Sequence, residues 1–125
     1  MLVKNIDMMN SVDVLKKISQ LDLPLKLSYK LAKNIMNIDS ELTIINTHKQ
    51  KLIDQYGEKD DNGKIKSDKD GNVKILDIEG WSTEYSELEN LEVEVDLKSI
   101  SEEELLSCDN INLTPSDLIA ISYML

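Results

Sequence analysis

Apolar residues recur every three or four positions along residues 25–56, with one break near His48 and Lys49, and this is the clearest pattern in the chain. The stripe consists of Leu27, Leu31, Ile35, Ile38, Leu42, Ile45, Leu52 and Tyr56. Because this spacing places side chains on one face of an α-helix, it predicts an amphipathic helix of about eight turns. Gly57 follows the last apolar position, where we expect a left-handed residue to end the helix.

A second, shorter helix is expected across residues 12–20, where Ser11 is a suitable N-cap and apolar residues again recur at helical spacing. This short helix can cover only part of the long stripe. Either the second half of the chain folds back over the rest, or a second subunit covers it. We favour the second subunit.

Turn-forming residues follow the long helix. Asn62-Gly63 and Asp70-Gly71 are strong turn dipeptides, and residues 73–77 then alternate between apolar and polar. They predict a β-hairpin over residues 64–76 with a charged tip that carries lysines. Residues 92–97 also alternate strictly, which predicts a half-buried strand over residues 93–97 that pairs with this hairpin.

Short helices are expected in the rest of the second half. Ser82 begins one that runs to about Asn90, with Trp81 as the apolar anchor of its entry turn, and Ser101 caps another. Thr114 caps a closing helix that is almost wholly apolar and therefore has to dock against something. No internal repeat is apparent.

Together these elements predict an α+β fold. A long helix in the N-terminal half and several short helices would pack on a small antiparallel sheet, made of the hairpin and one strand, and an apolar C-terminal helix would close the core. The length of 125 residues suits a single domain. Within it we expect a helical half (residues 1–56), a turn and hairpin segment (57–76) and an acidic mixed half (77–125).

Composition excludes several classes of protein. Hydrophobic residues make up 41% of the chain, which argues against disorder, and no apolar run approaches the ~20 residues of a membrane span. The first ten residues lack the basic and apolar regions of a secretory signal, so we expect a cytoplasmic protein. The single cysteine fits a reducing compartment.

Charge argues against nucleic acid as a direct partner. The basic residues are 14 Lys with no Arg, and the net charge is −10. Arg is the usual residue for bidentate recognition of phosphates and bases, and an acidic protein is repelled by a phosphate backbone. The acidity lies after Tyr56, where 6 Lys face 18 Asp and Glu, whereas 8 Lys face 6 acids before it.

The turn segment contains fragments that resemble a calcium-binding loop, with acids before Gly63 and before Gly71. Such a loop requires a bidentate acid at its twelfth position. Lys69 occupies that position in the first register, and the second register begins on Lys66 and ends on the short Asp77. Turn formation explains these acids better than calcium does.

Other reactive residues do not form a recognisable site. His48 is the only histidine and has no second metal ligand at a suitable spacing, and Cys108 lies beside Asp109, which disfavours a thiolate. Glu92, Glu94 and Asp96 are interpreted as the solvated face of the strand. We therefore expect no enzyme activity, no catalytic residue, no cofactor and no metal.

The order of these elements resembles a family of small uncharacterised proteins from tailed phages and prophages of low-GC Gram-positive bacteria. The matching stretches are LPLKLSYKLAKNI at residues 23–35, KLIDQYGEKDDNG at 51–63, DGNVKI at 70–75, VEVDLKSIS at 93–101 and INLTPSDLIAISYML at 111–125. The resemblance implies an accessory role in particle assembly or in takeover of the host cell. It includes no catalytic fingerprint.

We therefore expect a non-enzymatic phage accessory or assembly protein that acts through protein–protein contacts in the infected cell. Self-association is the expected contact, with a phage structural protein or a host protein as further partners, and incorporation into the virion is open. The interaction residues we expect are Ile35, Ile38, Leu42, Ile45, Tyr123, Met124 and Leu125. The alternative is an acidic inhibitor of a host defence or nucleic-acid-binding protein, which uses the carboxylates after Tyr56.

Overall fold

The computed structural model describes residues 1–108 and 112–125. Asp109, the acidic neighbour of Cys108, and Ile111, where the last matching stretch begins, lie outside the described residues. The chain divides into two compact units: unit 1 combines Met1–Leu42 with Glu92–Leu125, and unit 2 is Thr43–Leu91. Both ends of the chain thus belong to one unit, a grouping that differs from the three consecutive segments expected from the sequence.

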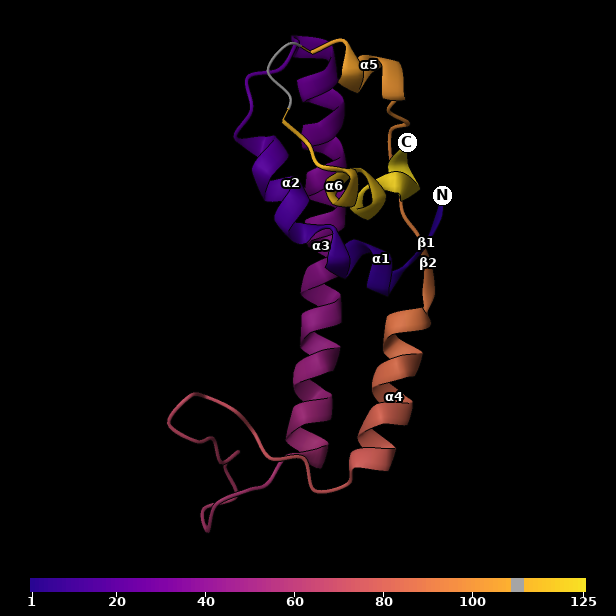
Figure 1. The fold of residues 1–125 in the computed structure, drawn as a ribbon. Helices are drawn as coiled ribbons and strands as arrows, with labels where there is room; N and C mark the ends of the chain where they lie inside the picture. Colours follow the sequence, from indigo (N-terminus) through magenta and orange to yellow (C-terminus); the bar gives the residue numbers. More distant parts are fainter. Residues whose placement is uncertain (109–111) are drawn as a thin grey trace. The chain divides into compact units, whose positions relative to one another are not determined.

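Unit 1 contains the first helices and all of the sheet in the described residues. Its elements are β1 (Leu2–Lys4), α1 (Asn5–Asn10), α2 (Val12–Ser19), the first part of α3 (Leu25–Tyr56), β2 (Glu92–Glu94), α5 (Glu102–Leu106), α6 (Pro115–Ala120) and the 3-10 turn η1 (Ser122–Met124). Figure 1 shows these elements; Lys17 of α2 pairs with Asp117 of α6 at 2.8 Å, and the Asn34 amide of α3 lies 3.9 Å from the Met124 sulfur of η1. The long helix and the small antiparallel sheet confirm the α+β class.

The sheet joins the two chain segments of unit 1. β1 and β2 run antiparallel with Val3 opposite Val93, and the Val95 N–H donates to the Met1 carbonyl at 2.9 Å. The predicted strand over residues 93–97 therefore exists only in its first part, and its predicted partner was wrong: it pairs with β1 and not with the hairpin. Leu2–Lys4 is too short for a sequence pattern to reveal, and neither β1 nor α1 was predicted.

Helix α3 spans Leu25–Tyr56 without interruption, as predicted. Four positions of its stripe are at most 4% exposed in the single chain, namely Leu27, Leu31, Ile38 and Ile45. Other residues of the same chain therefore exclude water from these four side chains. The preference for a second subunit over these positions is thereby corrected, because no second subunit is needed to exclude water from them.

Two asparagines of α3 hold the extended segment after β2. The Asn34 side chain is fully buried; its amide donates to the Lys98 carbonyl at 2.9 Å and accepts from the Lys98 N–H at 2.7 Å. Asn37 donates to the Asp96 carbonyl at 2.6 Å. These amides satisfy backbone groups that no neighbouring strand reaches, so this segment is fixed to the helix.

The predicted caps in the second half are present. The Ser101 hydroxyl accepts from the Glu104 N–H at 3.0 Å, and Thr114 and Asp117 form a reciprocal capping box with Pro115 in the first turn. The closing helix is shorter than predicted, however. It ends at Ala120 and continues as η1, so a long apolar C-terminal helix is absent from the described residues.

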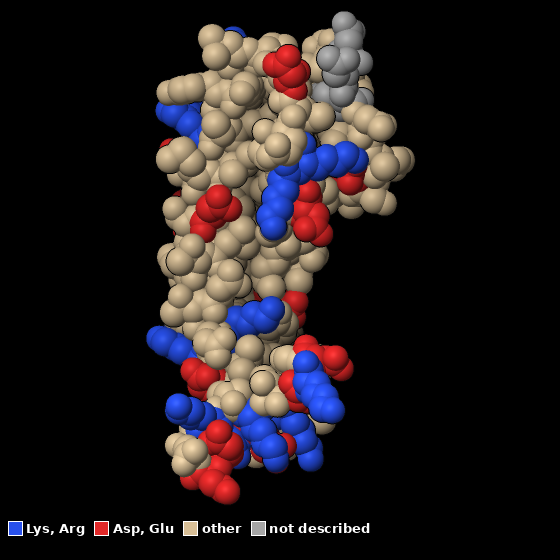
Figure 2. Space-filling view, turned by 90° about the vertical axis from the view of Figure 1, so that its left-hand side faces the viewer, with Lys and Arg blue, Asp and Glu red and all other residues tan. Residues whose placement is uncertain are grey.

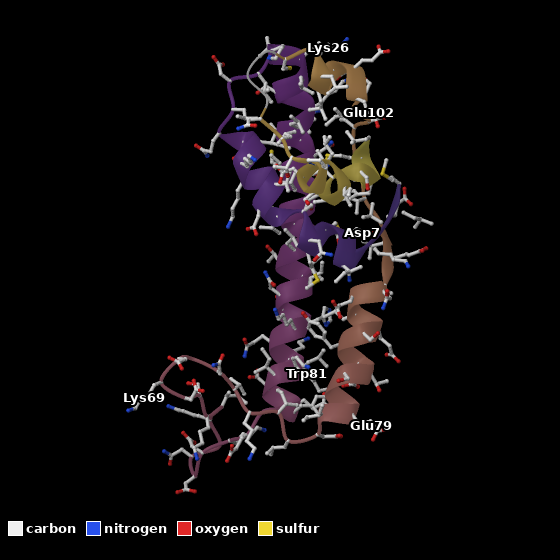
Figure 3. All side chains as sticks on the ribbon, in the orientation of Figure 1. Asp7, Lys26, Lys69, Glu79, Trp81 and Glu102 are labelled. Carbon is white, nitrogen blue, oxygen red and sulfur yellow. The ribbon has the colours of Figure 1, made fainter. Side chains whose placement is uncertain are left out.

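Unit 2 pairs the second part of α3 with α4 (Ile78–Asn90), and the two helices run side by side (Figure 1). Helix α4 begins four residues before the predicted start, because Asp77 is its N-cap and accepts from the Gly80 N–H at 3.1 Å. Trp81 therefore lies inside the helix and does not anchor an entry turn. It faces α3 and stacks on Tyr85 at 5.2 Å between ring centroids, whereas Glu79 points away (Figure 3).

The segment between α3 and α4 contains only isolated bridges in place of the predicted hairpin strands, joining Gly57 with Ile75, Lys59 with Ile65 and Ser67 with Val73. Two turns within it are alike. Asp60 Oδ1 accepts from the N–H groups two and four residues later at 2.9 and 3.0 Å, and Asp68 Oδ1 does the same at 2.9 Å for both. The same turn therefore occurs twice, eight residues apart.

Glycines in this segment serve two purposes. Gly63 and Gly71 have φ of +78° and +81°, as turn glycines do. Gly57 does not have a positive φ, so the predicted left-handed cap is wrong. Position 57 has no room for a side chain, because a Cβ there would lie 2.6 Å from the Ile53 carbonyl oxygen and 2.9 Å from the Val73 side chain.

The acidity divides between the units. Unit 1 contains 7 Lys and 13 acids (net −6), and unit 2 contains 7 Lys and 11 acids (net −4). The sequence before Tyr56 is nearly neutral and the sequence after it is acidic, but each folded unit combines residues so that both units are acidic. On the face in Figure 2, lysine and acidic side chains lie interspersed.

Candidate interaction surface

An apolar groove in unit 1 is the strongest candidate for a functional site. It has a volume of about 400 Å³ and is lined by Glu102, Leu105, Leu106, Leu118, Ile119, Ser122 and Leu125. We call these seven residues the groove. Leu106 is 75% exposed and Ile119 is 74% exposed, so two large apolar side chains face water at its rim. Large exposed apolar side chains that gather in one place are typical of a contact surface.

Local structure explains why the groove stays open. Leu105 is 2% exposed and anchors α5 in the core, which turns the neighbouring Leu106 outward. Ile121 and Met124 are at most 1% exposed and anchor the end of the chain in the same way. With both sides fixed by buried residues, α5 and α6 keep their remaining apolar side chains at the surface.

The groove is lined mainly by apolar side chains. Its polar side chains are one carboxylate and one hydroxyl, from Glu102 and Ser122. Apolar burial is therefore the main interaction that this surface offers.

The seven predicted interaction residues separate into buried and accessible sets. Ile38, Ile45 and Met124 are at most 2% exposed, so a partner does not reach them in this conformation. Ile35, Leu42, Tyr123 and Leu125 are partly exposed. Of the seven, only Leu125 lines the groove.

Tyr123 is bound within its own unit. Its hydroxyl lies 2.7 Å from the Ser11 hydroxyl, and Ser11 in turn donates to the Met8 carbonyl at 2.8 Å. Burial raises the pKa of the Tyr123 phenol above its ordinary value, against a smaller opposite effect of the Ser11 hydrogen bond. The phenol therefore stays neutral near pH 7 and ties η1 to α1 and α2.

Sequence reasoning missed a second apolar stripe on α3. Leu25, Tyr29, Ala32 and Met36 follow each other at intervals of four, three and four, and all are exposed. We call these four residues the ridge. Leu25 is 86% exposed, Tyr29 61% and Met36 68%. The spacing is visible in the sequence, but it is shorter and therefore weaker than the buried stripe on the same helix.

Lysines flank the ridge. Lys33 Nζ lies 4.9 Å from the centre of the Tyr29 ring, and Lys30 Nζ bonds Glu104 Oε1 at 2.9 Å. Lys26, in the first turn of α3, is exposed (Figure 3). The ridge is thus apolar with a positive border.

Unit 2 has a small polar and aromatic cluster. Tyr56 hydrogen-bonds Glu84, and this bond, followed by desolvation and the charges of Glu84 and Asp77, raises the pKa of the Tyr56 phenol. Lys49 Nζ lies 5.9 Å from the centre of the Tyr85 ring. These contacts join α4 to the second part of α3, which is a structural role.

The remaining candidate residues have ordinary surroundings. His48 is exposed on α3, and the Cys108 thiol donates to the Glu104 carbonyl at 3.3 Å. Glu92 and Asp96 are exposed, and Glu94 bonds the amino group of Met1. The Asp60 and Asp68 carboxylates accept backbone N–H groups of their own turns.

Within residues 1–108 and 112–125, no three His, Cys, Asp or Glu side chains gather closely enough to hold a metal ion. Although α3 has 32 residues, neither it nor another described helix carries an apolar run that would cross a bilayer. Comparisons with protein-family models, with curated proteins and with solved structures gave no significant match.

Proposed function

We propose that this protein is a non-enzymatic accessory or assembly protein of a tailed phage or prophage, and that it acts through protein–protein contacts. The observation that carries the proposal is the groove, where Leu106 and Ile119 are about three-quarters exposed beside Leu125. The resemblance of five sequence stretches to phage proteins supports the phage context.

The contact residues proposed here differ from those expected from the sequence. The groove residues Leu106, Ile119 and Leu125 replace the buried Ile38 and Met124. Apolar side chains at an open surface gain free energy when a partner removes them from water, whereas residues already buried gain nothing.

Static light scattering on the purified chain tests the proposal. We expect a mass that rises above the 14.2 kDa of one chain at micromolar concentrations. Ile119→Glu places a charge in the groove and should return the mass to that of one chain. Leu76→Glu is the matched control, because Leu76 is 65% exposed and lies in unit 2, outside the groove.

A constant mass of one chain at every concentration would argue against self-association. Equal loss of association in the Ile119→Glu and Leu76→Glu proteins would argue against the groove as the contact. The phage context has its own test, because the genes beside the coding sequence distinguish particle assembly from takeover of the host.

Inhibition of a host protein by the acidic residues stays a prediction. Lysines and acids are interspersed on the face in Figure 2, and each unit contains 7 lysines. A docking surface of that kind would gather charge of one sign, which the face in Figure 2 does not do.

A further inference from the structure

We propose that the groove of one copy binds the α3 ridge of a second copy, so that copies join head to tail. This inference rests on the proposed function and names the partner of the same groove. It joins two surfaces of unit 1 that are both apolar and both open to water: Leu25, Tyr29 and Met36 on the ridge, and Leu106 and Ile119 on the groove. Their exposure also shows that the ridge does not fill the groove of its own copy.

Charge complementarity identifies the occupant. The three elements that form the groove, α5, α6 and η1, contain Glu102, Glu103, Glu104 and Asp117 and no lysine. Residues 25–38 of α3, which contain the ridge, carry three lysines and no acid. An apolar surface with a negative border and one with a positive border attract each other and repel copies of themselves.

Ion pairs within unit 1 leave the needed charges available. Glu104 is bonded to Lys30 at 2.9 Å, and Asp117 to Lys17 at 2.8 Å. In the described part of the chain, Glu102 and Glu103 have no lysine within ion-pair distance. Lys26 and Lys33 likewise have no acid within ion-pair distance among these residues. The Lys30–Glu104 pair also shows that a lysine of α3 and an acid of α5 form a good ion pair.

Symmetric pairing fits these surfaces less well. In a two-fold contact the same patch faces itself, so ridge on ridge would bring lysines together and groove on groove would bring glutamates together. A contact between two different patches leaves one ridge and one groove unused in every pair. Such contacts continue into a ring or an open filament.

Mixing two association-defective variants tests this arrangement. Met36→Glu disables the ridge and Ile119→Glu disables the groove, and both positions are more than two-thirds exposed, so the fold tolerates the changes. Circular dichroism verifies that each variant is folded. Each alone should remain at the mass of one chain, whereas an equimolar mixture should form a pair that contains one of each and grows no further.

Light scattering gives the mass, and native mass spectrometry identifies the mixed pair. Wild-type protein should grow beyond two copies, and Leu76→Glu should behave like wild type. If the wild type associates but the mixture remains at one chain, or if Met36→Glu still pairs with itself, the head-to-tail contact is overturned and the proposed function stands. If Ile119→Glu still pairs with itself, the groove is not the contact, and the proposed function loses its main support as well. If the wild type itself never exceeds one chain, self-association fails, and this inference fails with it.

Discussion

The buried Asn34 side chain supplies the hydrogen bonds that a neighbouring strand would otherwise make with Lys98. Residues 95–100 follow β2 and belong to no helix or strand, and Asn34 supplies both a donor and an acceptor to Lys98. Asn34 is fully buried, so water does not substitute for it. Removal of the amide would leave backbone groups unpaired in a dry environment, which is costly.

Asn34→Ala should therefore lower the free energy of unfolding by about 2 kcal/mol. Asn37→Ala is the matched control on the same helix, because it loses one hydrogen bond and its side chain is only half-buried. Urea titration measures both losses. Equal losses in the two variants would contradict the special role of the buried amide.

Asp117 makes the stability of unit 1 depend on pH. The Lys17 ammonium and the Thr114 N–H bond its carboxylate and hold the pKa of Asp117 below its ordinary value. A lowered pKa in the folded state means that the unfolded chain takes up the proton first as the pH falls. The stabilisation is present above about pH 4 and disappears as the pH falls through the folded pKa.

Asp117→Asn should accordingly lower the melting temperature at pH 7, and its difference from wild type should narrow below about pH 4. Lys17→Met removes one of the two hydrogen-bond partners of the Asp117 carboxylate. Its difference in melting temperature from wild type should also narrow below about pH 4, but by a smaller amount. Thermal unfolding followed by circular dichroism at several pH values provides the test. A difference that stays constant from pH 7 to pH 3 would be inconsistent with a lowered pKa.

At the scale of elements, the connection between α3 and α4 depends on glycines of two kinds. Gly57 leaves room for the Ile53 carbonyl and Val73, whereas Gly63 and Gly71 supply positive φ and have no atom within 4 Å of the point where a Cβ would lie. A side chain at Gly57 collides with backbone, which does not move easily. A side chain at Gly63 meets only a conformational cost, which Asn tolerates well.

Substitution by Asn should affect stability differently at Gly57, where space is limiting, and at Gly63, where the positive φ is. Gly57→Asn should destabilise the protein by about 1–3 kcal/mol, as overpacking does, whereas Gly63→Asn should cost well under about 1 kcal/mol. Chemical denaturation with Trp81 fluorescence reports the losses in unit 2. A Gly63→Asn protein that is less stable than Gly57→Asn would refute the steric explanation of Gly57.

Sequence patterns predicted the elements whose signals are local. The α3 stripe repeats over 32 residues, and the caps at Ser101 and Thr114 need only a few neighbouring residues, so both were found. The start of α4 was missed because Asp77 was assigned to a strand alternation, although it has the chemistry of an N-cap.

At the scale of the whole molecule, α3 is the element that both units share. Leu27, Leu31 and Ile38 bury it in unit 1, and Ile45 buries it in unit 2. Each unit thus stabilises one part of α3, and the helix runs from unit 1 into unit 2 without a break. Helix formation is cooperative, so loss of one part weakens the other.

We therefore expect one unfolding transition. Trp81 is the only tryptophan and reports on unit 2, while far-ultraviolet circular dichroism reports on the helices of both units. The two urea curves should coincide, and Asn34→Ala in unit 1 should shift the Trp81 curve as well. A Trp81 midpoint that Asn34→Ala leaves unchanged would indicate two independent units.

The sequence did not predict the partner of β2 or the groove, because both depend on contacts between residues far apart in the chain. Val3 and Val93 are neighbours in space but 90 positions apart in the chain, and no local pattern specifies that pairing. The groove arises where α5 and α6 each keep an apolar side chain outside the core. Periodicity marks Leu106 and Ile119 as apolar, but only the packing of Leu105 and Ile121 decides that they face water.

The two like turns bear on how the connection between α3 and α4 can change in length. Asp60 and Asp68 begin turns with the same hydrogen bonds eight residues apart, and Ile65 and Val73 occupy the same place after each. Deletion of residues 60–67 would remove one complete turn and bring Lys59 to the place of Ser67, opposite Val73. A shortened chain of this kind should therefore still close the connection between the two helices.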